Sequence, residues 1–135
     1  MSDCIFCKIV AGQVPCHKIY ENDFVMAFLD IFPHAKGHTV IIPKKHFSAL
    51  NEWTAEEWQK FSESLRLVSE LVRRVLKPDG MNIGVNDQPA AGQVVPHVHW
   101  HIFPRWEGDG GGSVHSIIKN HGEMSAAEVA KLFQM

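Results

Sequence analysis

The chain has 135 residues and a formal net charge of -2 at pH 7, and 45% of its residues are hydrophobic. This length and composition suit a single globular domain, residues 1–135, that can bury a core. The charge gives no basic surface for nucleic acid, and no apolar run is long enough to span a membrane. Three cysteines do not form a disulfide framework, and with no signal-peptide pattern they favour a reducing cytoplasm.

The first part of the chain predicts one short helix and three strands. The helix is expected to begin with Ser2 or Asp3 as its N-cap residue, because both side chains can accept a hydrogen bond from the first helical turn. Asn22 and Asp23 form a turn signal between two apolar runs, which is typical of a β-hairpin. The strands are expected at residues 18–21, 24–29 and 38–43.

The middle of the chain predicts a long amphipathic helix. Thr54 and Glu57 form a capping box that starts it, and Pro78 and Gly80 follow its end. Apolar residues recur there in steps of three and four, which places them on one buried face. They are Trp58, Phe61, Leu65, Val68, Val72 and Val75.

Two further strands and a second short helix follow. The strands are expected at residues 81–86 and 97–103. Ser125 and Glu128 form another capping box, which opens a helix expected to run through Phe133. Strands, one long helix and further strands predict an α+β fold with a mainly antiparallel, five-stranded sheet.

The last predicted strand holds three histidines in strict alternation with apolar residues. His97, His99 and His101 would share one face, since side chains alternate along a strand with a period of two. Three partly desolvated imidazoles bring no packing gain, so this row favours chemistry over a structural role. Pro104 is expected to end the strand. Just upstream, the loop at residues 86–93 is rich in small residues that let backbone N–H groups approach a phosphate.

From residue 97 to 103 the chain matches the pattern His-φ-His-φ-His-φ-φ, where φ is apolar, and it resembles the histidine triad (HIT) superfamily of nucleotide hydrolases and transferases. The resemblance covers nearly the whole chain and is greatest to the nucleotide-binding branch, in particular to bacterial members with a Cys-x-x-Cys motif. It implies the HIT-like fold, with the long helix packed on the sheet and short helices at both ends. It also implies a homodimer that pairs through the long helix and a sheet edge. The other segments that carry it are residues 4–9, 28–31, 42–46 and 92–93, with His38, Asn86 and Arg105.

Cys4 and Cys7 have the spacing of a zinc knuckle. By itself the pair is equally consistent with a redox pair or with two buried thiols. The resemblance supplies the two further ligands that a zinc site needs, because the corresponding histidines of the bacterial members align with His46 and His97. Two thiolates and two imidazoles would complete a closed tetrahedral shell around a structural Zn²⁺. Cys16 has no partner by spacing and is expected to be a packed thiol.

The resemblance also implies a site for a purine nucleotide or nucleotide conjugate. The family's ribose-binding aspartate aligns with Asp30, and its phosphate loop aligns with Asn86, Gly92, Gln93 and Val94. Val94 departs from the pattern, which usually has Ser or Thr there, so one hydroxyl donor to phosphate is missing. The residues that match the apolar positions around the base are Phe6, Ile9, Phe28 and Ile31.

His99 aligns with the family's nucleophile, and we expect it to attack the α-phosphorus and form a covalent nucleotidyl-histidine. A neutral imidazole can attack when one nitrogen faces the substrate and the other is held as N–H, which a nearby backbone carbonyl could do. His101 would donate to the phosphate, and His38 would support the triad. The expected substrates are nucleoside phosphoramidates, aminoacyl adenylates or dinucleoside polyphosphates.

Two other functions stay open from the sequence. The chain could be a metal-dependent hydrolase in which His97 and His99 chelate a catalytic ion. It could instead be a nucleotide-binding regulatory module with little turnover, which the missing hydroxyl at Val94 favours.

Overall fold

Five strands form one antiparallel sheet in the computed structural model, which describes residues 3–134. The strands lie in the order β1-β2-β3-β5-β4, and each neighbouring pair is antiparallel. This arrangement confirms the α+β fold that the sequence predicts. The strand bounds are β1 His17–Glu21, β2 Val25–Leu29, β3 Thr39–Pro43, β4 Gly80–Val85 and β5 Trp100–Arg105.

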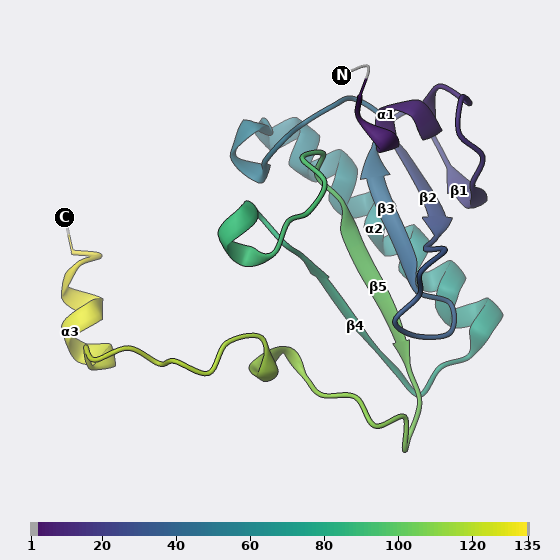
Figure 1. Cartoon of the computed structure of the whole chain (residues 1–135). Coiled ribbons are helices and arrows are strands. Elements are labelled where there is room, and N and C mark those ends of the chain that lie inside the picture. Colours follow the sequence, from purple (N-terminus) through teal and green to yellow (C-terminus); the bar gives the residue numbers. More distant parts are fainter. Residues whose placement is uncertain (1–2, 135) are drawn as a thin grey trace.

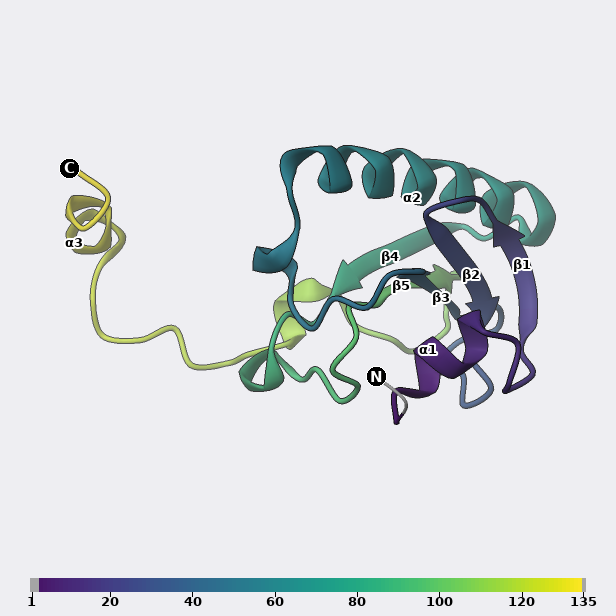
Figure 2. The ribbon, with the colours of Figure 1, turned by 90° about the horizontal axis from the view of Figure 1, so that it is seen from above.

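Helices lie on both faces of the sheet (Figure 1, Figure 2). The long helix α2 crosses one face, and the short helix α1 lies on the opposite face. Helix α3 lies apart from the sheet, at the end of an extended C-terminal segment. Within residues 3–134, no helix is both long enough and apolar enough to cross a membrane. The helix bounds are α1 Ile5–Val10, α2 Ala55–Leu76 and α3 Ala126–Lys131, with short 3-10 helices at Leu50–Glu52, Pro89–Ala91 and Val114–Ser116.

The strand β2 is buried on both faces, because each face of the sheet has its own apolar core. Val25 and Ala27 belong to the core beneath α2, whereas Met26 and Phe28 belong to the core beneath α1. This alternation follows the period of two along a strand, and it explains why the sequence of β2 is apolar throughout. The core beneath α2 also contains Ile41, Phe61, Val68, Val72, Val98 and Ile102, and the core beneath α1 contains Ile9, Val40 and Ile42.

The capping box predicted for α2 is confirmed. Thr54 Oγ1 accepts a hydrogen bond from Glu57 N at 3.2 Å, and Glu57 Oε1 accepts one from Thr54 N at 2.9 Å. The predicted apolar face is wrong at both ends. Trp58 is 37% exposed, and Val75 is 63% exposed while Leu76 packs against the core in its place. Gly37 makes room for this contact, because Leu76 Cδ1 occupies the space that a Cβ at residue 37 would fill.

Helix α1 begins later than predicted. Its N-cap residue is Cys4, whose Sγ accepts a hydrogen bond from Cys7 N at 3.4 Å. Asp3 precedes the cap, and Ser2 lies outside the described residues. A thiol therefore takes the capping position that the sequence assigned to an oxygen acceptor. Helix α3 ends at Lys131, two residues earlier than predicted.

Strand β5 begins and ends later than predicted. The first two triad histidines precede it, because Val98 N donates to the carbonyl of Phe47 at 2.7 Å instead of joining a strand ladder. Pro104 lies inside β5 and does not end it. The pairing of β5 with β3 stops at Ile102, so Pro104 is bordered by β4 and not by β3. Proline lacks a backbone N–H, but at this position its absence disrupts no hydrogen bond to β3.

Lys77 follows α2 in the left-handed conformation, with φ 52° and ψ 52°. We expect Lys77→Gly to raise the free energy of unfolding by about 0.5–1 kcal/mol, because glycine adopts this conformation without the steric cost of a Cβ. Urea denaturation would measure the change. Gly37→Ala is the opposite control and should lower the unfolding free energy, since Gly37 has φ +78° and contacts Leu76. A less stable Lys77→Gly protein would contradict this account of the helix end.

Candidate functional site

Four potential metal ligands from three segments meet beside α1. Cys4 and Cys7 come from the N-terminal end of α1, His46 from the loop after β3, and His97 from the segment before β5. Their ligand atoms all lie within 4.8 Å of one another. The Nδ1 atom of His97 lies 3.3 Å from Sγ of Cys4 and 3.6 Å from Sγ of Cys7, and the Nδ1 atom of His46 lies 3.3 Å from Sγ of Cys7. The structure thus brings together the four residues that the sequence analysis singled out.

The orientation of the His97 ring suits a metal ligand. His97 is fully buried, and its Nε2 lies 2.9 Å from the carbonyl oxygen of Pro43. A carbonyl can only accept, so Nε2 carries the proton and Nδ1 presents its lone pair to the two thiols. Burial lowers the pKa of His97 to about 4, which keeps the ring neutral at pH 7. Two cysteine sulfurs and two neutral imidazoles fit Zn²⁺ in a closed tetrahedral site.

The ring of His99 is fixed with one nitrogen directed at the backbone. Its Nδ1 donates to the carbonyl oxygen of His97 at 2.8 Å, so its Nε2 carries a lone pair. The side chain is 8% exposed, and burial lowers its pKa. The ring of Phe6 packs edge-on against it, with ring centroids 5.0 Å apart. The expected bond to a backbone carbonyl is therefore present, and Nε2 is a potential nucleophile.

A chain of hydrogen bonds fixes the third triad histidine. The backbone N–H of His34 donates to Nδ1 of His38 at 3.3 Å, so the proton of the neutral His38 ring is on Nε2. That Nε2 donates to Nδ1 of His101 at 2.9 Å, which leaves the proton of His101 on its own Nε2. Burial lowers the pKa of His38 and lowers that of His101 to about 4. His101 thus offers an N–H donor beside His99, and the two ring centroids are 5.1 Å apart.

Asp30 follows β2 in the loop that carries His34. Its Oδ1 accepts a hydrogen bond from Phe32 N at 2.8 Å. Its Oδ2 lies 3.7 Å from Nδ1 of His38, whereas the backbone nitrogen of His34 lies 3.3 Å from the same atom. The shorter of these two contacts, from the His34 N–H, decides which nitrogen of His38 is protonated. The Asp30 side chain is partly exposed beside the triad, where a carboxylate can accept hydrogen bonds from a ribose.

The four apolar residues predicted to contact the base differ in exposure. Phe6 packs against His99 and against Phe28, whose ring centroid is 5.8 Å away. Phe28 and Ile9 belong to the core beneath α1 and are almost fully buried. Ile31 is 68% exposed in the loop after β2. Phe6 is half-buried, so Phe6 and Ile31 are the two residues with exposed surface that a base could contact.

The predicted phosphate loop is braced by its own groups. The Gln93 side chain accepts a hydrogen bond from Gln88 N at 2.7 Å and donates to two backbone carbonyls, at 2.9 and 3.0 Å. The N–H of Gly92 donates to the carbonyl of Pro89, and the N–H of Gln93 donates to that of Gln88. These two N–H groups therefore maintain the loop, although the sequence pattern suggested that they would approach a phosphate.

Two other groups of this loop remain as donors. Between residues 3 and 134, no backbone hydrogen bond engages the N–H of Val94, and the residue as a whole is 88% exposed. The side-chain amide of Asn86 lies beside Gly92, where a Cβ would stand 3.8 Å from it. Gly92 also has φ +98°, a backbone conformation of this turn that glycine adopts without strain.

Sequence reasoning missed two residues that shape the site. His34 acts through its backbone N–H, a group that every residue except proline has, so its side chain gave no signal. Gln88 turns the phosphate loop with φ 80°, a conformation that is uncommon for a residue with a Cβ. Neither role could be found from residue type.

Comparison with known families agrees with this arrangement. Residues 11–108 match the family model for the HIT domain. The chain belongs to the HIT family. A HIT-like protein of Methanocaldococcus jannaschii is 47% identical over 107 residues, which cover 79% of this chain and 82% of that protein. An adenosine 5'-monophosphoramidase of Schizosaccharomyces pombe is 42% identical, with 76% and 74% covered. An adenylylsulfatase of Arabidopsis thaliana is 41% identical, with 80% and 55% covered.

Solved structures of similar proteins share the fold. A Bacillus subtilis HIT family protein superimposes with a TM-score of 0.83 at 39% identity, covering 96% of this chain and 92% of that one. A Streptococcus mutans protein gives a TM-score of 0.85 at 36% identity, covering 98% and 82%. A zinc-bound histidine triad family protein of Mycobacterium smegmatis gives a TM-score of 0.75 at 38% identity, covering 81% and 79%.

The backbone N–H of His34 should set the tautomer of His38. His34→Pro removes this N–H together with the ring, whereas His34→Ala removes the ring alone. We expect ¹⁵N NMR to find the His38 proton on Nε2 in the wild-type protein and in His34→Ala. In His34→Pro the tautomer ratio should move toward Nδ1 by about two- to tenfold, as expected for the loss of one hydrogen bond. An unchanged ratio in His34→Pro would refute this role.

Proposed function

We propose that this HIT family protein is a nucleotide hydrolase that cleaves at the α-phosphate of purine nucleotide conjugates. Two relatives have names of this kind, the monophosphoramidase and the adenylylsulfatase. The observation that carries the proposal is the hydrogen bond from His99 Nδ1 to the His97 carbonyl. It leaves a neutral imidazole whose Nε2 lone pair lies beside the N–H donor of His101. The substrate classes are nucleoside phosphoramidates, aminoacyl adenylates and dinucleoside polyphosphates.

In the proposed reaction, Nε2 of His99 attacks the α-phosphorus in line with the leaving group. A P–N bond forms, the bond to the leaving amine, carboxylate or phosphate breaks, and the nucleotide is held as nucleotidyl-histidine; an amine takes up a proton from solvent as it leaves. Water then attacks the same phosphorus, breaks the P–N bond and loses a proton to solvent, which releases the nucleoside monophosphate and restores the neutral imidazole. Two in-line displacements retain the configuration at phosphorus.

Donors from three segments would stabilise the charge on the phosphoryl oxygens. His101 would donate through Nε2, Asn86 through its side-chain amide, and Val94 through its backbone N–H. The fold holds these groups in place before substrate binds, so no reorganisation is needed during the reaction. Asp30 would accept hydrogen bonds from the ribose hydroxyls, and Phe6 would pack against the base.

We expect His99→Ala to lower kcat by a factor on the order of 10⁴ or more, because it removes the nucleophile. AMP should still bind with a Kd within about threefold of the wild-type value, since its ribose and base contacts are retained. Steady-state assays with adenosine phosphoramidate and calorimetric titration with AMP would measure the two effects.

Rapid quenching of the wild-type protein should also trap AMP on His99. His17→Ala, at an exposed position in β1, is the control and should behave as wild type in both assays. Wild-type turnover in His99→Ala, or inversion at phosphorus, would show that the mechanism is wrong.

A nucleotide-binding module with little turnover is a second candidate, because Val94 lacks the hydroxyl donor expected at its position. AMP binding without release of product from any of the three substrate classes would favour it. The metal-dependent alternative fits the geometry less well. Nδ1 of His97 faces two thiols and Nδ1 of His99 donates to the backbone, so the two rings do not direct their lone pairs at one ion.

A structural zinc is also proposed, held by Cys4, Cys7, His46 and His97. The Mycobacterium smegmatis relative is described as zinc-bound, and the four donors here have suitable types and spacing. When bound, the ion would supply folding energy by joining the N-terminal segment to the triad segment. A reducing compartment such as the cytoplasm would keep both thiols available as ligands.

Metal analysis of the purified protein should give about one zinc per chain. Cys4→Ser should lose the metal and lower the melting temperature, because the remaining three donors leave the shell open. Cys16→Ser should keep both the metal and the melting temperature, since Cys16 lies outside the four-residue group. A metal-free protein that binds AMP and melts like the zinc-containing form would refute the proposal.

A homodimer through α2 and a sheet edge is proposed from the family resemblance. Leu67 and Leu71 are partly buried on α2 and could add to such an interface. Leu76, at the end of the same helix, packs against the protein's own core and adds nothing to such an interface.

A further inference from the structure

The two thiols at the start of α1 form a close pair in their own right. The side chain of Cys4, the N-cap residue, folds over the first turn of the helix, so that its Sγ accepts a hydrogen bond from Cys7 N at 3.4 Å. The two sulfurs also lie within 4.8 Å of each other. Residues three apart in a helical turn have Cα atoms about 5 Å apart, inside the range of about 4.4–6.8 Å that a disulfide spans. The pair can therefore close to a disulfide without unwinding the helix.

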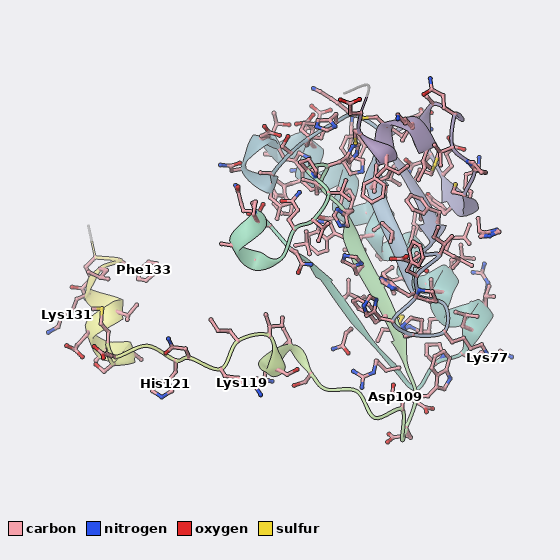
Figure 3. All side chains as sticks on the ribbon, viewed as in Figure 1. Lys77, Asp109, Lys119, His121, Lys131 and Phe133 are labelled. Atoms are coloured by element: carbon pink, nitrogen blue, oxygen red, sulfur yellow. The ribbon has the colours of Figure 1, made fainter. Side chains whose placement is uncertain are left out.

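Solvent has access to this pair. Cys7 and His46 are half-buried, whereas His97 is fully buried. The C-terminal segment does not cover α1, since Figure 3 shows Lys119 and Phe133 standing clear of the sheet and its helices. Helix α1 also lies on the face of the sheet opposite α2, the helix through which the dimer is proposed (Figure 2). A small oxidant can thus reach Sγ of Cys7.

Oxidation would remove the two donors that the metal group shares. Nδ1 of His97 faces the sulfurs of Cys4 and Cys7, at 3.3 and 3.6 Å, and Nδ1 of His46 faces that of Cys7, at 3.3 Å. The thiolate is the form of cysteine that binds a metal, and a disulfide has no thiolate to offer. The two imidazoles that remain leave half of a tetrahedral shell empty. Closing the disulfide is therefore incompatible with retention of the proposed zinc.

Helix α1 would lose an anchor at the same time. Ile9 is the buried residue of this six-residue helix, which is too short to be stable by itself in water. When zinc is bound, the cysteines join its N-terminal end to the segments that hold His46 and His97. Phe6 lies between the two cysteines in the chain and packs against His99, with ring centroids 5.0 Å apart. Release of the ion would thus loosen the aromatic wall proposed for the base.

We propose that Cys4 and Cys7 form a peroxide-sensitive switch, which exchanges bound zinc for a disulfide and thereby weakens nucleotide binding. In the zinc-loaded site both cysteines are held as thiolates. The Cys7 thiolate attacks one oxygen of a hydroperoxide, so that an S–O bond forms, the O–O bond breaks and the leaving oxygen takes up a proton from solvent.

The second step closes the disulfide. The Cys4 thiolate attacks Sγ of Cys7, an S–S bond forms, and the S–O bond breaks as hydroxide takes up a second proton and leaves as water. The sulfurs together lose two electrons, and these reduce the peroxide. The switch rests on the zinc site and the nucleotide site proposed above, and it adds a signal that would control both.

Titration of the reduced, zinc-loaded wild-type protein with hydrogen peroxide would test the switch. We expect release of about one zinc per chain, measured with a colorimetric chelator, and a disulfide between Cys4 and Cys7, mapped by mass spectrometry after digestion. The Kd for AMP should rise about five- to tenfold in calorimetric titration. Dithiothreitol with added zinc should reverse all of these changes.

Two serine variants form a matched pair for the chemistry of the second step. Cys16→Ser should respond to peroxide as the wild type does, because Cys16 lies outside the four-residue group. In Cys4→Ser, Cys7 has no partner within the pair, so peroxide should carry it on to sulfinic acid, which dithiothreitol does not reverse.

Several outcomes would count against the switch. Zinc that stays bound in the presence of excess peroxide, or sulfinic acid at Cys7 of the wild type, would overturn it. An unchanged Kd for AMP in the oxidised protein would overturn its link to the nucleotide site. A reduced protein that is purified without zinc would overturn the zinc site and the switch together. None of these readouts uses turnover, so a protein that switches but hydrolyses no substrate would contradict the proposed hydrolase alone.

Discussion

One buried ring, that of His97, joins the parts of the molecule on which the site depends. Its Nε2 donates to the carbonyl of Pro43 at the end of β3, and its Nδ1 faces the thiols at the start of α1. Its own carbonyl accepts a hydrogen bond from the ring Nδ1 of His99. A single residue thus ties the sheet, the N-terminal helix and the neighbouring imidazole together. Any change that turns this ring or its peptide group would displace all three.

Burial and hydrogen bonds act together on the other histidines of the site. Desolvation disfavours the charged form of an imidazole, and it lowers the pKa values of His38, His99 and His101. A neutral ring has one donor and one acceptor nitrogen, so a single fixed bond decides the role of both. The His97 carbonyl gives His99 an outward lone pair, and the His34 N–H gives His101 an outward proton. Neighbouring rings thereby acquire opposite functions, His99 directly from a backbone carbonyl and His101 from a backbone N–H that acts through the ring of His38.

Much of the fold could be predicted because its signals are local. Capping boxes, turn residues and apolar periods specify α2 and the strands to within one or two residues at most ends. Pro104 was misjudged because its tolerance depends on where β3 stops pairing, which is a long-range property. The Cys4 cap was missed for a similar reason, since the usual capping oxygens were present one and two residues earlier.

The side chains of the candidate site could be predicted from the sequence, whereas the roles of its backbone N–H groups could not. The alternation of histidines and the family resemblance identified the residues that meet, including ligands more than 90 positions apart such as Cys4 and His97. The N–H of His34 and the engaged N–H groups of Gly92 and Gln93 left no trace in the sequence. Backbone donors are the same in every residue other than proline, so only the folded chain shows which of them are occupied.

Helix α1 carries a consequence for how two ligands influence one another. Phe6 lies between Cys4 and Cys7 in the chain and packs against His99, so one six-residue helix contributes both to the proposed zinc site and to the proposed base site. If the ion orders this helix, it also orders the aromatic wall on which the purine would rest. Thermodynamic reciprocity then requires that bound nucleotide raise the affinity for the metal by the same factor as bound metal raises the affinity for nucleotide. A site usually regarded as purely structural would in this way set part of the nucleotide affinity.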